Sequence, residues 1–207
     1  MFGLTPLELK VLKRLNTPHK IQDFLDTLAI NYEKEGETYM SPRRVLRTGK
    51  AHCLEGALLA AVALWLNGED PLILDLKAPK DEDHVVALYK RNGYWGAISK
   101  TNHATVRSRD PIYKTIRELT VSYFHEYFIN ETGKKTLRSY SRPLNMKKFG
   151  TDWITTEDDL WDIPWQLDQL KHFEIFPKKN QKHIRKADMM EKKAGELREW
   201  SVMDERT

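Results

Sequence analysis

The chain has 207 residues, of which 40% are hydrophobic and 31% are charged, and its formal net charge is +4. This composition excludes an intrinsically disordered chain and predicts a single domain over residues 1–207. The single cysteine excludes an internal disulfide framework, and the N-terminal residues lack the basic start and apolar run of a signal peptide. We therefore expect a cytoplasmic protein that does not enter the membrane.

The first part of the chain is predicted to be helical. Apolar residues recur with helical spacing over residues 6–15 and again over residues 18–28. Ser41-Pro42 then supplies a cap and a first-turn proline for a short third helix. These features predict an N-terminal helical segment over residues 1–44.

A buried helix is predicted to begin at the only cysteine, Cys53. Residues 54–66 contain one charged residue, Glu55, and a helix that is apolar on every side is a buried one. This run is shorter than the roughly 20 residues that cross a bilayer. A cysteine in the first turn of a helix receives the positive end of the helix dipole, which favours the thiolate.

Three antiparallel strands are predicted after this helix, over residues 71–76, 84–90 and 94–99. Asn92-Gly93 is a strong signal for a tight turn between the second and the third strand. We therefore expect a buried helix packed on an antiparallel sheet, within an α+β core that spans residues 45–140.

The remaining residues are predicted to add helices around this core. Asp110-Pro111 has the cap and the first-turn proline of a long amphipathic helix that ends near residue 130. Residues 136–146 suit an edge strand that a proline interrupts. A last helix is expected over about residues 181–200, within a C-terminal extension that spans residues 141–207.

His84 is the histidine whose position best suits a partner for Cys53. It begins the second predicted strand, where a helix that crosses the sheet would bring the two side chains together. An imidazole beside a thiol activates it as a nucleophile. A third residue is then needed to orient the imidazole ring.

The predicted hairpin provides candidates for this third residue. With Asn92-Gly93 as the turn, His84 lies opposite Thr101, and Ser99 lies diagonally from His84 on the same face at about 7–8 Å. Asn102 falls on the other face unless the strand has already ended or bulged. Asp75 is a further candidate if the 77–83 turn brings it alongside His84.

Glu55 requires a partner, because an unpaired carboxylate in an apolar helix is costly. Arg43, Arg44 and Arg47 precede the helix and are the predicted partners. This interaction would be structural.

The residues Gly49–Ala57, Asp83–Val86 and Tyr94–Ser99 together resemble the transglutaminase-like superfamily. The resemblance covers about residues 45–99, and its flanks resemble an uncharacterised bacterial subgroup. It implies a papain-like core with a cysteine at a helix start, a histidine on one strand and an aspartate on the next strand. The superfamily includes protein cross-linking enzymes, peptidases and deglycosylating amidases.

Ser99 stands where this family usually carries the aspartate. A serine hydroxyl can accept a hydrogen bond from an imidazole N–H, but it has no charge to stabilise an imidazolium. Asn102 could take the role instead, as asparagine does in papain-like proteases. The expected oxyanion donor is the Cys53 backbone N–H, and the second donor is the His52 side chain, the Thr48 hydroxyl or a loop N–H.

The leading hypothesis is a cysteine-dependent amide hydrolase or acyl transferase that acts through a thioester on a peptide or a small-molecule amide or ester. The alternative is a binding module that keeps the fold but has a degraded triad. No cofactor or metal is expected, because the chain lacks a thiolate cluster, a His-Glu-x-x-His motif and a phosphate-binding loop. The lysines of residues 178–193 are the sole feature that favours nucleic acid, and they suit a solvated helix face.

Overall fold

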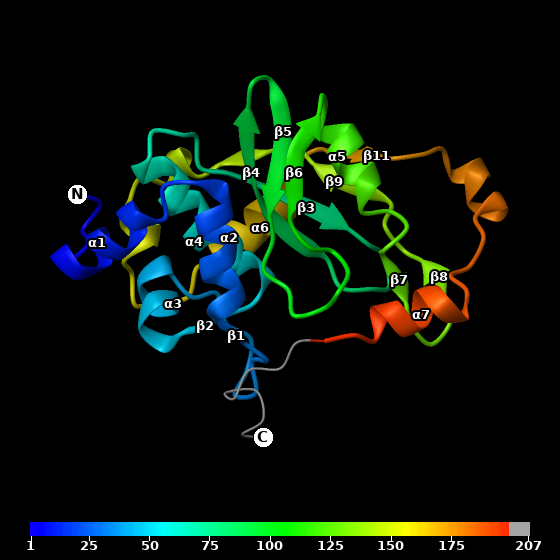
Figure 1. Cartoon of the computed structure of the whole chain (residues 1–207), viewed down its shortest axis with the longest axis horizontal. Helices are drawn as coiled ribbons and strands as arrows, with labels where there is room; N and C mark the ends of the chain where they lie inside the picture. The colour runs from blue at the N-terminus through cyan, green and yellow to red at the C-terminus, as the bar shows by residue number, and fades with distance from the viewer. Residues whose placement is uncertain (199–207) are drawn as a thin grey trace.

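An antiparallel sheet forms the centre of the molecule, whose computed structural model describes residues 1–198 (Figure 1). Within these residues the sheet has seven strands in the order β11-β9-β3-β4-β5-β6, and β10 pairs with β3. The strands are β3 (Leu72–Lys77), β4 (His84–Arg91), β5 (Tyr94–Ile98), β6 (Arg109–Tyr113), β9 (Ser139–Ser141), β10 (Leu144–Asn145) and β11 (His172–Glu174). The chain is therefore a mixed α+β structure, and the predicted meander β3-β4-β5 lies in the middle of the sheet.

The turn between β4 and β5 fixes which residues face one another. Asn92 and Gly93 both have positive φ angles, 50° and 87°, as a two-residue hairpin turn requires. Arg91 pairs with Tyr94, and Ala87 pairs with Ile98. This is the register that the sequence predicted.

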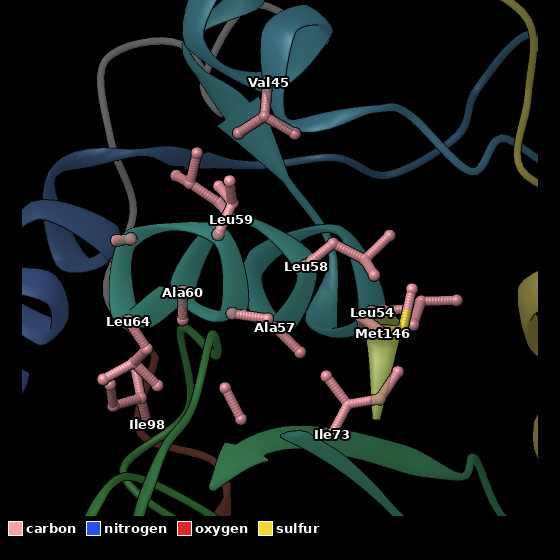
Figure 2. Close-up of a cluster of buried hydrophobic side chains, with 14 of the residues drawn as sticks. Val45, Leu54, Ala57, Leu58, Leu59, Ala60, Leu64, Ile73, Ile98 and Met146 are labelled. Carbon is pink, nitrogen blue, oxygen red and sulfur yellow. The ribbon is translucent and has the colours of Figure 1, made fainter. Parts of the chain in front are cut away.

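The helix α4 (Cys53–Leu66) covers one face of the sheet. All residues from 54 to 64 are buried, which confirms the predicted buried helix. Figure 2 shows α4 between Val45, from α3 (Pro42–Thr48), and the sheet residues Ile73 and Ile98. Among residues 1–198, α4 included, no helix has both the length and the apolar run that crossing a bilayer would need.

The helix α5 (Ile116–Ser122) packs on the opposite face. Its Leu119 joins a second apolar cluster with Leu74, Val86 and Leu88, whereas Val85 and Ala87 belong to the cluster around α4. Successive strand residues point to opposite faces, so the central strands supply both clusters.

The N-terminal helices pack against α4, as Figure 1 shows. The helices α1 (Pro6–Arg14), α2 (Pro18–Thr27) and α3 each begin with a proline and are capped by the side chains of Thr5, Thr17 and Ser41. These caps satisfy N–H groups that have no partner within the helix. The predicted N-terminal helices are confirmed, and a short parallel pair, β1 (Ala29–Ile30) with β2 (Lys50–Ala51), leads the chain into Cys53.

The long helix predicted from Asp110-Pro111 to about residue 130 is wrong. Both residues lie in β6, and α5 begins only after Thr115, which caps it. β6 is at one end of the strand order. An edge strand tolerates a proline because one side of it makes no ladder hydrogen bonds.

The predicted C-terminal helix is also shorter than expected. The segment consists of the 3-10 helix η3 (Lys178–His183) and the helix α7 (Met189–Gly195), and residues 199–200 of the prediction lie outside the described residues. Asp188 accepts hydrogen bonds from the Met190 and Glu191 N–H groups and so starts α7 as a separate helix. The predicted strand over residues 136–146 is present as β9 and β10, on either side of Pro143. The expected edge position is wrong for β9, which lies between β11 and β3.

The other elements lie around the sheet. They are β7 (Phe128–Ile129), β8 (Lys134–Lys135), η1 (Met146–Phe149), η2 (Asp152–Ile154) and α6 (Asp162–Gln169). Figure 1 shows α7 beside the β7–β8 pair. The C-terminal segment therefore returns to the end of the molecule at which these two short strands lie.

Gly56 allows α4 to approach the chain that follows β5. A Cβ at this position would lie 2.4 Å from the Lys100 Cβ. We expect Gly56→Ala to lower the free energy of unfolding by about 2 kcal/mol, because the helix must shift away from Lys100. Urea denaturation measures this change. If the free energy of unfolding instead increased by about 1 kcal/mol, which is the gain in helix propensity from glycine to alanine, the contact with Lys100 would impose no constraint.

Candidate functional site

Cys53 is the first residue of α4 and lines a cavity of about 670 Å³. Its side chain is partly exposed. The cavity is bordered by the starts of α4 and β4, by the loop after β5 and by the β7–β8 turn, and its lining includes Cys53, His84, Asn102, His103 and Tyr127. The sequence-predicted nucleophile and its predicted partner His84 therefore face the same space.

The surroundings of Cys53 favour the thiolate. Burial by itself raises the pKa of the thiol, but hydrogen bonds and positive charge from His52 and His84 outweigh it and lower the pKa to about 5. The start of α4 adds the positive end of the helix dipole. At neutral pH the sulfur is therefore negatively charged and nucleophilic.

The His84 ring is held by Ser99. His84 Nε2 lies 2.7 Å from Ser99 Oγ, and Ser99 Oγ donates to the Val106 carbonyl oxygen at 2.7 Å. A hydroxyl has a single proton, so Ser99 Oγ must accept from His84 Nε2–H. This arrangement keeps a proton on Nε2, so Nδ1 is the nitrogen left for Cys53 and, in the neutral ring, it carries the lone pair that accepts the thiol proton.

The other candidates for the third residue make different contacts. Asn102 Nδ2 donates to the Tyr32 hydroxyl at 3.1 Å, and Thr101 Oγ1 accepts from the His103 N–H. Asp75 pairs with Val85 in the sheet. Among these candidates, the structure joins Ser99 directly to His84.

Asp75 is buried and belongs to a separate group of charged side chains, in which Asp83 and Asp168 are exposed. It binds His172 Nε2 at 3.1 Å, and burial raises its pKa although that hydrogen bond opposes the change. Asp75, Asp83 and Asp168 lie within 4.8 Å of one another, and the Lys77 ammonium forms ion pairs with all three. The chain itself therefore supplies the positive charge that this group of carboxylates needs.

His52 caps the helix that begins at Cys53. Its Nδ1 accepts from the Leu54 N–H at 3.2 Å, and its Nε2 lies 2.9 Å from the Thr38 carbonyl oxygen. Burial lowers the pKa of His52, but Cys53, Glu55 and the Thr38 carbonyl outweigh it and raise the pKa to about 9. The Leu54 N–H favours the neutral ring, so helix capping and the thiolate compete for the same side chain.

Glu55 is fully buried, and its partners differ from the prediction. Its carboxyl oxygens accept from Asn31 Nδ2, the Thr38 hydroxyl, the Met40 N–H and the His52 N–H. The predicted arginine partners are wrong, because these side chains bind other acids: Arg43 with Glu8, Arg44 with Asp159 and Arg47 with Glu157. Backbone and amide donors therefore compensate the burial of Glu55, with the His52 ring 3.5 Å away.

Two of the expected oxyanion donors are engaged elsewhere. The Thr48 hydroxyl donates to Met40 Sδ at 3.8 Å, and both ring nitrogens of His52 have the contacts given above. The Cys53 N–H, in the first turn of α4, is still the expected oxyanion donor, because the first N–H groups of a helix have no partner within it.

Sequence reasoning missed two residues that hold Ser99, namely Gln22 and Val106. Gln22 lies on α2 and bonds to the Ser99 backbone, 77 positions along the chain. A single glutamine beside an apolar helix stripe gives no signal for such a contact. Val106 has a φ angle of 52°, a conformation that the sequence does not indicate for a β-branched residue.

The comparisons with known proteins assign the chain to no family. No protein-family model matches the chain, and no curated protein is similar to it. The chemistry of the cavity is therefore argued below from the arrangement of its own residues.

Proposed function

We propose that the protein is a cysteine-dependent amide hydrolase or acyl transferase of transglutaminase-like type, with a papain-like core. The observation that carries this proposal is the placement of Cys53 and His84 in one cavity, with the pKa of the thiol lowered to about 5. Its substrate is a peptide or a small-molecule amide or ester. The proposed reaction needs no cofactor, because the thiolate is the nucleophile and the imidazole transfers the proton.

The first half of the reaction forms a thioester. The Cys53 thiolate, whose proton has already passed to His84, forms a bond to the substrate carbonyl carbon. The Cys53 N–H stabilises the negative charge on the carbonyl oxygen. As the C–N or C–O bond breaks, the His84 imidazolium gives its proton to the leaving amine or alcohol, and the acyl group stays on Cys53 as a thioester.

The second half releases the acyl group. His84 Nδ1 accepts a proton from water or from an amine as that nucleophile attacks the thioester carbonyl. The C–S bond then breaks, and Cys53 leaves as the thiolate. Water gives an acid and completes hydrolysis, whereas an amine gives a new amide and completes acyl transfer.

Ser99 takes the place of the acidic third residue in this proposal. Because it accepts from His84 Nε2–H, it sets the orientation and the tautomer of the ring, as an aspartate would. It supplies no charge, so we expect a weaker stabilisation of the imidazolium. The proposed reaction needs Cys53 in its reduced form, so we expect the enzyme to act in the cytoplasm.

The pH dependence of thiol alkylation tests the proposal. With iodoacetamide between about pH 4 and pH 9, the rate should reach half of its maximum near pH 5 and stay level above about pH 6. The sign follows from the lowered pKa, because the thiolate fraction rises as the pH rises through that value. Cys53→Ser should abolish labelling. A half-maximum near the ordinary value of 9.0 would refute the proposed function.

A binding module without catalysis is the second candidate, and the absence of charge on Ser99 favours it. The same cavity would then hold a ligand without forming a covalent bond. A panel of acyl-transfer probes distinguishes the two candidates. Covalent labelling of Cys53 by any of these probes supports the enzyme, whereas a low thiol pKa with no acylation supports the module.

A further inference from the structure

The side-chain amide of Gln22 is bonded to both backbone groups of Ser99. Its Oε1 accepts from the Ser99 N–H at 2.9 Å, and its Nε2 donates to the Ser99 carbonyl oxygen at 2.8 Å. Nε2 also donates to Asp26 Oδ1 at 2.9 Å, which sets the orientation of the amide, because a carboxylate can only accept. Gln22 thus replaces a neighbouring strand at the point where β5 has ended.

The hydroxyl of Ser99 is fixed from the other side by Val106. The Val106 carbonyl takes the hydroxyl proton, and the Val106 N–H donates to Glu126 Oε2 at 2.9 Å. Val106 has a φ angle of 52°, which is strained for a β-branched residue. This conformation therefore holds the carbonyl in place to accept from Ser99.

Because of these two sets of contacts, Ser99 can only accept a hydrogen bond from His84. Its backbone cannot turn without breaking the bonds to Gln22, and its only proton is used by Val106. Ser99 Oγ therefore presents a lone pair to His84 Nε2–H, 2.7 Å away. Without this restraint the hydroxyl could rotate and donate to Nε2, which would move the ring proton to Nδ1 and take away the base that faces the thiol.

We propose that Gln22 is a positioning residue, which fixes Ser99 as the proton acceptor of His84 and so keeps the His84 ring proton on Nε2. This proposal concerns the tautomer of His84. Its importance for catalysis rests on the proposed function. Gln22 acts through Ser99 from a different helix.

The ¹⁵N chemical shifts of the His84 ring nitrogens report the tautomer directly. At a pH at which the His84 ring is neutral, the wild-type protein should show the Nε2–H form alone. Gln22→Met keeps the length of the side chain and removes its hydrogen bonds to Ser99 and Asp26, and it should give a mixture of the two tautomers. The matched control, Asp23→Met, changes an exposed residue of the same helix and should leave the Nε2–H form in place.

Gln22→Glu keeps the length of the side chain and removes its hydrogen-bond donor. An ionised carboxylate faces the Ser99 carbonyl and Asp26 without a proton to donate, so the mixture of tautomers should appear at neutral pH. The variant therefore tests the contact with the Ser99 carbonyl by removing the donor alone.

Alkylation of Cys53 gives a second readout. At pH 6 we expect Gln22→Met to slow it by about threefold to tenfold, which is the effect of one hydrogen bond. A single Nε2–H tautomer in a folded Gln22→Met variant would overturn the proposal. The two proposals fail separately: an ordinary thiol pKa in the wild type refutes the enzyme, while the tautomer measurement still decides the role of Gln22.

Discussion

Replacing His84 with alanine should slow the alkylation of Cys53 by about tenfold at pH 6. The hydrogen bond and the charge of His84 are among the causes that lower the pKa of the thiol to about 5. Removing one of the two imidazoles should raise that pKa by about two units, which leaves roughly a tenth of the sulfur as thiolate at pH 6. With a turnover assay the loss should be larger, about 10²–10⁴-fold, because the variant also lacks its general base.

The measurement is the alkylation rate as a function of pH. The half-maximum should move upward from about pH 5, and the rate at high pH should be close to that of the wild type. His183→Ala, which removes an exposed histidine of η3, is the matched control and should leave the profile unchanged. An unchanged profile in His84→Ala would mean that His52 alone activates the thiol.

The hairpin register explains why Ser99 could be named from the sequence as one of the candidate partners of His84. Asn92-Gly93 favours a single turn type, and a two-residue turn fixes every pairing along β4 and β5. Once His84 and Ser99 share a face, a hydrogen bond between them requires only that the side chains reach each other. A turn type that two residues specify therefore determines which side chains face one another along the whole hairpin.

The contacts that set the chemistry of the site could not be predicted in the same way. Gln22 reaches Ser99 from α2, and three of the partners of Glu55 come from the loop around residues 31–40. Both depend on how helices pack, which the spacing of residues within one element does not contain. The prediction for Asp110-Pro111 was wrong for a related reason: a proline after an aspartate suits a helix start and an edge strand alike, and the sheet decides between them.

Replacing Glu55 should have the largest effect on stability. The Glu55 side chain has no exposed surface, and it connects three parts of the chain. One oxygen accepts from the Thr38 hydroxyl at 3.2 Å and from the Met40 N–H at 2.9 Å, and the other accepts from the His52 N–H at 2.9 Å. Asn31 Nδ2 lies within 3.3 Å of both oxygens. Each oxygen therefore faces donors.

We expect Glu55→Gln to lower the free energy of unfolding by about 3 kcal/mol, because its NH₂ group must face donors in either orientation of the amide. Glu55→Leu removes all the acceptors and should cost at least as much, since it leaves the same buried donors unpaired. Urea denaturation measures both values. Glu131→Gln, at an exposed position in the β7–β8 turn, is the control and should change stability by less than about 0.5 kcal/mol.

Glu55→Gln also shows whether Glu55 affects the reactivity of the Cys53 thiol in addition to the stability of the fold. Glu55 holds the His52 N–H at the start of α4, so a loss of Glu55 loosens the turn that presents Cys53. Under conditions in which Glu55→Gln is still folded, the half-maximum of Cys53 alkylation should move upward, because His52 loses the carboxylate that helps to keep its ring charged. A destabilised variant with an unchanged alkylation profile would place Glu55 in the fold alone and leave the activation of Cys53 to His84 and the helix dipole.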